Sequence, residues 1–166
     1  ASKVEKRMGD KWTYTSPTPE IRAGGQGEAT YLRVRVRNTS RSLAKSCRAY
    51  LTNVQRIDRT GHLRATEYCD SIQLAWSVRP GDPYGSEDLA QDVPYFVDVA
   101  SFRDGTDVFL PHVKSLPFRY NPIFAAQGKY LLTIIVSGAG VPPRTLKLRF
   151  EWAVARLEGN AGVLPV

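Results

Sequence analysis

His62 and His112 are the bases that the sequence offers to a nucleophilic or hydrolytic site. Such a site needs one of them beside a serine or cysteine and an orienting acid. Both histidines lie in loop-like sequence, and Cys47 is expected to face the core. The sequence has no Gly-x-Ser-x-Gly elbow, phosphate-binding glycine loop or paired-histidine metal motif. We therefore expect no enzyme, no catalytic residues and no cofactor. A hydrolase or metal site assembled from loop residues is kept as an alternative.

Residues 104–107, with the sequence Asp-Gly-Thr-Asp, have the oxygen ligands that calcium prefers. They lack the ligand count of a recognisable calcium loop, and Asp-Gly pairs commonly form plain turns. We expect a turn there and no metal site.

Cys47 and Cys69 are the only cysteines, too few for a disulfide scaffold or a thiolate zinc site. Two interpretations stay open. The two cysteines lie near what could be adjacent strands, so they could form one disulfide. Alternatively, both could be buried free thiols that act as small hydrophobes.

Alternating apolar and polar residues predict the strands that would position these groups. Residues 129–136 are apolar on both faces, which is typical of a central strand. No segment has a sustained helical period, so the pattern predicts an all-β sandwich or barrel. The loops 80–91 and 101–127 are long, and three prolines restrict any strand in the second to a short or edge position. The expected strands cover residues 31–38, 47–57, 72–76, 95–99, 129–136 and 145–152.

The length of 166 residues fits a single domain. We expect an N-terminal arm and loop over residues 1–29, the β-sandwich over 30–154 and a flexible tail over 155–166. Trp12 and Tyr14 could form a short edge strand within the first part. The longest apolar stretch is far too short to cross a bilayer, and no signal-peptide pattern opens the chain.

Two segments resemble the immunoglobulin-like modules of bacterial proteins, including the cell-adhesion-related type. Residues 32–40, Leu-Arg-Val-Arg-Val-Arg-Asn-Thr-Ser, with the strand at 47–51, resemble the strand–Asn–turn–strand opening of those modules. Residues 128–133 begin Gly-Lys-Tyr and are similar to the start of a penultimate strand, whose tyrosine hydroxyl bonds back to a loop backbone. Residues 67–72 and 146–152 look like an uncharacterised bacterial sandwich domain that is often attached to membrane-anchoring segments.

The resemblance implies a two-sheet antiparallel immunoglobulin-like sandwich. It also implies that the arginine-rich strand pairs with the strand carrying Asp98, so that cross-strand ion pairs neutralise part of the arginine row. The net charge of +7 permits a polyanionic partner. The charge is expected to be spread over both sheets, whereas nucleic-acid binding would need one stripe with stacking aromatics. The candidate polyanion contacts are Arg33, Arg35 and Arg37 on one sheet and Lys147 and Arg149 on the other.

Modules of this class serve adhesion, assembly and substrate presentation, so the resemblance implies a non-catalytic interaction or structural module with a protein as its partner. The two long loops and an open edge strand are the expected contact surfaces. The chain could be the soluble part of a membrane-anchored bacterial protein, cytoplasmic or membrane-tethered, with membrane contact only through a segment absent from it. Binding of nucleic acid or anionic lipid through the basic surface is the first alternative.

Overall fold

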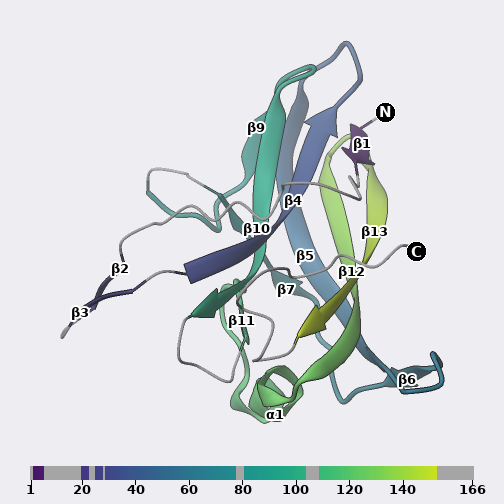
Figure 1. The fold of residues 1–166 in the computed structure, drawn as a ribbon. Helices are drawn as coiled ribbons and strands as arrows, with labels where there is room; N and C mark the ends of the chain where they lie inside the picture. Colours follow the sequence, from purple (N-terminus) through teal and green to yellow (C-terminus); the bar gives the residue numbers. More distant parts are fainter. Residues whose placement is uncertain are drawn as a thin grey trace.

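The computed structural model describes residues 2–5, 20–22, 25–27, 29–77, 81–103 and 109–152. Over these residues the protein is mainly antiparallel β-strand, as the sequence predicts (Figure 1). No helix in the described ranges is long and apolar enough to cross a membrane. The predictions for Trp12, Tyr14, the Asp-Gly turn at 104–107 and the tail at 155–166 lie outside the described residues.

The first sheet is built around the predicted arginine strand. Its order is β1-β4-β10-β11, and β8 also pairs with β10. The bounds are Ser2–Glu5 for β1, Ala29–Asn38 for β4, Ala75–Trp76 for β8, Pro94–Arg103 for β10 and Phe109–Pro111 for β11.

The second sheet contains the segment that is apolar on both faces. Its order is β13-β12-β5-β6, with β7 and β9 also paired to β5, so β12 is central as predicted. The bounds are Ala44–Ile57 for β5, Leu63–Ala65 for β6, Ile72–Gln73 for β7, Glu87–Leu89 for β9, Gly128–Ala139 for β12 and Val141–Trp152 for β13.

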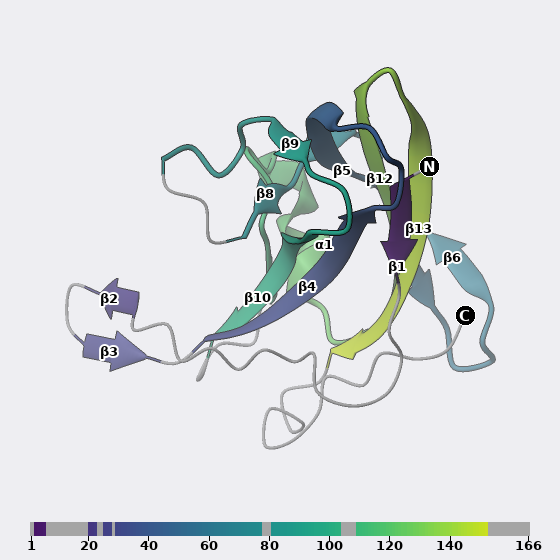
Figure 2. The same ribbon diagram turned by 90° about the horizontal axis from the view of Figure 1, so that it is seen from above.

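The N-terminal region contains more structure than the predicted arm and loop. β1 pairs with β4 and lies beside β13 (Figure 2). β2 (Glu20–Arg22) and β3 (Gly25–Gly27) form a separate two-stranded hairpin. The polar character of residues 2–5 concealed β1, which occupies an edge of β4 that would otherwise present unpaired backbone groups.

The segment expected to form one strand over residues 72–76 instead passes between the two sheets. β7 pairs with β5 of the second sheet, and β8 pairs with β10 of the first. Leu74 lies between them, is fully buried and forms an isolated bridge to Val113. The alternation correctly placed Leu74 and Trp76 in the interior, but it could not show that the chain changes sheets between them.

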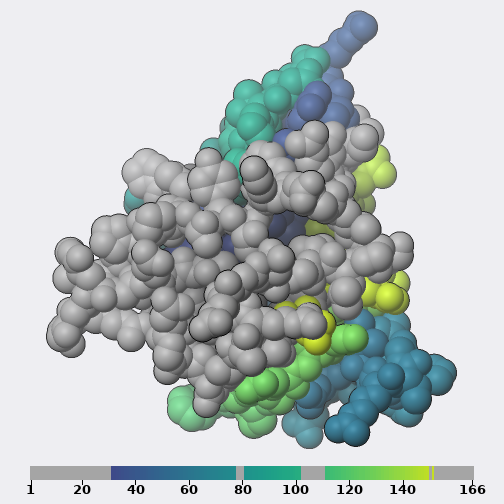
Figure 3. Space-filling model, viewed as in Figure 1, coloured from purple at the N-terminus to yellow at the C-terminus, as the bar shows by residue number. Residues whose placement is uncertain are grey.

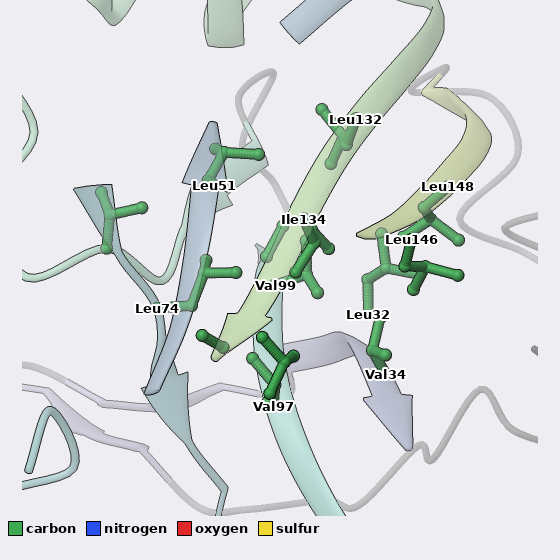
Figure 4. Packing of buried hydrophobic residues seen from close by; sticks show 14 of the residues in the cluster. Leu32, Val34, Leu51, Leu74, Val97, Val99, Leu132, Ile134, Leu146 and Leu148 are labelled. Atoms are coloured by element: carbon green, nitrogen blue, oxygen red, sulfur yellow. The ribbon is translucent and has the colours of Figure 1, made fainter. Parts of the chain in front are cut away.

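The inward rows of both sheets pack into one hydrophobic cluster (Figure 4). The alternation of apolar and polar residues explains this, because successive side chains on a strand point to opposite faces. Burying these side chains is the main stabilising contribution to the fold. The labelled members are Leu32 and Val34 of β4, Leu51 of β5, Leu74, Val97 and Val99 of β10, Leu132 and Ile134 of β12, and Leu146 and Leu148 of β13.

β5 and β12 approach each other closely near the end of β5 that begins at Ala44. A methyl group on Gly138 would lie 2.7 Å from the Sγ of Cys47 and 2.7 Å from the carbonyl oxygen of Lys45. Such distances are well inside normal carbon contact. Glycine is therefore the residue that this position accommodates.

The loop predicted over 101–127 ends in two short helical turns, η1 (Phe118–Tyr120) and α1 (Asn121–Ala125). The sequence did not predict them. Pro122 stands in the first turn of α1, where proline is well tolerated. Tyr120 and Phe124 are buried and join the core from these turns. β11, in the same loop, is short and at the edge of the first sheet, as the prolines predict.

Candidate functional site

The arginine row of β4 is held by carboxylates on the neighbouring segments. Arg33 stands opposite Asp98 in the β4–β10 register, and its Nε donates to Asp98 Oδ1 at 2.6 Å. Both side chains are largely buried, 14% and 12% exposed. Arg37 donates to Asp92 from both Nε and Nη2, at 3.0 and 2.8 Å. The predicted pairing of the arginine strand with the Asp98 strand is therefore confirmed.

The ring of Tyr31 contacts both Arg33 of the arginine row and His112, one of the two candidate bases. The guanidinium carbon of Arg33 lies 4.8 Å from the centre of the Tyr31 ring. On the same ring packs His112, with 5.2 Å between the ring centres. Arg33 is thus enclosed by a carboxylate and an aromatic face, which leaves little of its charge available to a partner.

Lys147 and Arg149 lie on β13 in the second sheet, as predicted. In the register with β12, Lys147 stands opposite Thr133 and Arg149 opposite Leu131. The five candidate polyanion contacts therefore do not form one stripe, because they occupy two different sheets.

The two histidines lie in different parts of the structure. His62 is exposed in the turn between β5 and β6, where its Nδ1 lies 2.7 Å from Thr60 Oγ1. Thr60 donates its single hydroxyl proton to Asp58 at 2.6 Å, so it cannot also donate to His62. Asp58 also accepts the backbone N–H groups of Thr60 and His62.

These hydrogen bonds, led by that from the Thr60 hydroxyl, lower the pKa of Asp58 to about 2. The group of Asp58, Thr60 and His62 therefore braces a turn. His112 packs against Tyr31 beside the first sheet, so the two histidines do not share a site with an acid.

Both cysteines are free thiols in the structure, Cys47 buried and Cys69 exposed. Burial raises the pKa of the Cys47 thiol, and the charge of Asp88 acts in the same direction. Thr66, three residues before Cys69, bonds to the carbonyl of Val54. Val54 lies on the order of 20 Å along β5 from Cys47, far beyond the Cα separation of a disulfide. The structure thus contains no Cys47–Cys69 disulfide, and only one of the two thiols is buried.

Cys69 instead belongs to a polar network around the hydroxyl of Tyr120. This hydroxyl donates to Asp70 Oδ2 at 2.8 Å and accepts from the backbone N–H of Cys69 at 3.3 Å. The Nη2 of Arg119 bonds to Asp70 at 2.7 Å and to the Tyr120 hydroxyl at 3.0 Å. Burial raises the pKa of Tyr120, and its bonds to Cys69 and Asp70 raise it further. The network ties η1 to the segment after β6.

Tyr130 ties the other end of α1 to β12. Its hydroxyl donates to the carbonyl of Ile123 at 2.9 Å and lies against the carbonyl of Ala126. This is the tyrosine-to-loop contact that the resemblance leads us to expect. Burial raises the pKa of the Tyr130 phenol. η1 and α1 are therefore anchored on both sides.

Phe118, the first residue of η1, is the most exposed of the large apolar side chains in the described residues, at 88%. Residues 115–127 carry a single charged side chain, Arg119, which pairs with Asp70. Pro122 and Ala125 are also exposed on this segment. We call the exposed side of residues 115–127 the Phe118 surface.

The sequence predictions did not single out the Phe118 surface. The sequence did contain a signal for an apolar surface. Residues 115–127 have one charged residue, although the chain as a whole is 23% charged, and so few charges are unusual for a solvated loop. The exposure of Phe118 could not be read from it, because Phe118 and the buried Phe124 both follow a proline-containing loop sequence.

The described ranges hold no group of three or more His, Cys, Asp or Glu side chains arranged to bind a metal ion. The sequence matches no protein-family model, and no curated protein matches it in sequence.

Proposed function

We propose that the chain is a non-catalytic interaction module with an immunoglobulin-like two-sheet sandwich, and that it binds its partner through the Phe118 surface. The observation that carries this proposal is the 88% exposure of Phe118 on a turn that is anchored from two sides.

An exposed aromatic side chain on a fixed turn is suited to binding. Covering a phenylalanine contributes about 1.5–3 kcal/mol, and aromatic residues are enriched among those that dominate interface energies. The Tyr120 and Tyr130 hydrogen bonds order the turn before any partner arrives. Ordering in advance lowers the entropic cost of association.

The sandwich part of the proposal has three supports. The two sheets share one hydrophobic cluster. The arginine strand pairs with the strand that carries Asp98, and Tyr130 bonds to the loop before it. An experimental structure whose two sheets face each other across that cluster would establish the arrangement.

The arginine row is a weaker binding surface than its charge suggests. Arg33 and Arg37 already have carboxylate partners, so a polyanion would have to displace Asp98 and Asp92. Displacement of the buried Asp98 would be costly. We therefore place binding at the Phe118 surface.

Affinity capture from the lysate and the membrane fraction of source cells tests the proposal. The wild-type chain is compared with the Phe118→Ser variant and with a control variant, Leu43→Ser. Leu43 is also exposed, at 47%, but it precedes Ala44, at the end of β5 far from Ile57. We expect a component that wild type and Leu43→Ser retain and that Phe118→Ser loses. Equal retention by all three chains would show that the Phe118 surface is not the binding site.

A further inference from the structure

A second exposed apolar side chain lies at the same end of the molecule as Phe118. Leu63 of β6 is 42% exposed and pairs with Ile57 at the end of β5. Ile57 also pairs with Lys129, at the start of β12 just after α1. Figure 3 shows the green surface of the α1 region and the blue surface of the β5–β6 turn together at the lower edge.

Three cations lie at this end of β5. Arg56 and Arg59 stand on either side of Ile57 and Asp58, and Lys129 follows α1 and pairs with Ile57. All three are exposed, and in the described part of the chain none of them forms an ion pair.

The acidic residues at this end are largely engaged. Asp58 pairs with Arg64 at 3.0 Å, and Asp70 pairs with Arg119 at 2.7 Å. Glu67, between β6 and β7, is exposed, and Glu151 of β13 stands opposite Lys129 in the β12–β13 register. The three cations without an ion pair outnumber these two acids, so the described part of this end presents apolar side chains beside a small excess of positive charge.

We infer that the partner of the Phe118 surface is an anionic lipid bilayer, into whose headgroup region Phe118 and Leu63 insert. This inference rests on the proposed function and names its partner. The two apolar side chains stand on separate elements, Phe118 on η1 and Leu63 on β6. A bilayer accepts such side chains without a matching shape, and its anionic headgroups attract the surrounding lysine and arginine side chains. Nucleic acid offers no apolar layer for Leu63 or Pro122.

The binding should be modest and dependent on salt. Loss of a partly inserted phenylalanine weakens binding about tenfold. Loss of one cation near an anionic surface weakens it roughly fivefold. High ionic strength screens the attraction between exposed charges.

The experiment is co-sedimentation of the full chain with vesicles of phosphatidylcholine, with and without phosphatidylglycerol. We expect binding only to the anionic vesicles, with release at high salt. Phe118→Ser should bind about tenfold more weakly, and the double variant Arg59→Gln/Lys129→Gln at least as weakly. Leu43→Ser should bind like wild type.

The inference would be overturned by a lack of binding to anionic vesicles, or by equal binding of wild type and Phe118→Ser to them. Binding to DNA that depends on Phe118, in the absence of vesicle binding, would also overturn it. If cell extracts still yield a component that Phe118→Ser loses, the proposed function survives and only the bilayer is excluded. Unchanged folding of each variant is checked by circular dichroism.

Discussion

Two arginine–aspartate contacts of nearly equal length lie in very different surroundings. Arg33 and Asp98 meet at 2.6 Å between two strands, with side chains 14% and 12% exposed. Arg119 and Asp70 meet at 2.7 Å beside η1, with side chains 60% and 36% exposed. The first has been withdrawn from water into the face of a sheet, whereas the second remains in contact with solvent.

The difference shows what each pair contributes. A largely buried pair cannot lose one partner without leaving an uncompensated charge, so it constrains the register of β4 and β10. An exposed pair contributes little to stability, but Arg119 also bonds to Tyr120 and so positions the turn that presents Phe118. The first pair serves the fold, and the second serves the candidate binding surface.

The largest expected effect is that of Asp98→Ala. Arg33 would remain largely buried without its partner, which costs about 3 kcal/mol. Urea unfolding measures the loss. The double variant Arg33→Met/Asp98→Leu should recover much of it, because an apolar pair of similar volume is nearly neutral. A loss below about 0.5 kcal/mol for Asp98→Ala would remove the distinction between the two pairs.

In contrast to Asp98→Ala, Asp70→Asn should affect partner binding more than the free energy of unfolding. Its effect on unfolding in urea should stay within about 1 kcal/mol, because the pair with Arg119 is exposed. Binding to the component that the wild-type chain captures should nevertheless weaken, because η1 loses the carboxylate that accepts from Arg119 and Tyr120. A normal affinity for Asp70→Asn, measured beside the Phe118→Ser variant, would show that the network does not position Phe118.

Asp92→Asn measures how much an exposed ion pair of the same arginine row contributes to stability. Asp92 pairs with Arg37, and their side chains are 52% and 38% exposed. We expect a change of a few tenths of a kcal/mol in the free energy of unfolding. A cost as large as that of Asp98→Ala would mean that burial does not separate the two positions of the arginine row.

The prediction for pH dependence concerns Asp58, whose folded pKa of about 2 lies below its usual range. The unfolded state then binds the proton more tightly. The stabilising contribution of Asp58 is therefore complete above the usual aspartate pKa and is lost as the pH falls towards 2. Titration of the side-chain carboxyl carbon by NMR measures this pKa. A midpoint near the ordinary aspartate value would show that the turn hydrogen bonds do not persist in solution.

The strands were predictable because burial on one face imposes a period of two on the sequence. β4 and β13 show this plainly, since Leu32 and Leu146 belong to rows in which every second residue is buried. The pairing of the arginine strand with the strand that carries Asp98 also followed from the resemblance, whereas the register that puts Arg33 opposite Asp98 came only from the structure.

The change of sheet at Leu74 could not be predicted. An inward side chain satisfies either sheet equally, and only the distant partners Leu51 and Val97 distinguish them. α1 is five residues long and carries no helical period. It exists because Phe124 is buried and Tyr130 bonds to its backbone, contacts that a local pattern does not reveal.

Site-specific photo-crosslinking tests most directly where the molecule binds. A benzophenone amino acid is placed at position 118, at position 147 on β13, or at position 43 beyond the opposite end of β5, and each chain is irradiated in cell extract that includes membranes. Binding through the Phe118 surface should give adducts at position 118 well above those at the other two positions. Adducts at position 147 or 43 with none at position 118 would contradict it.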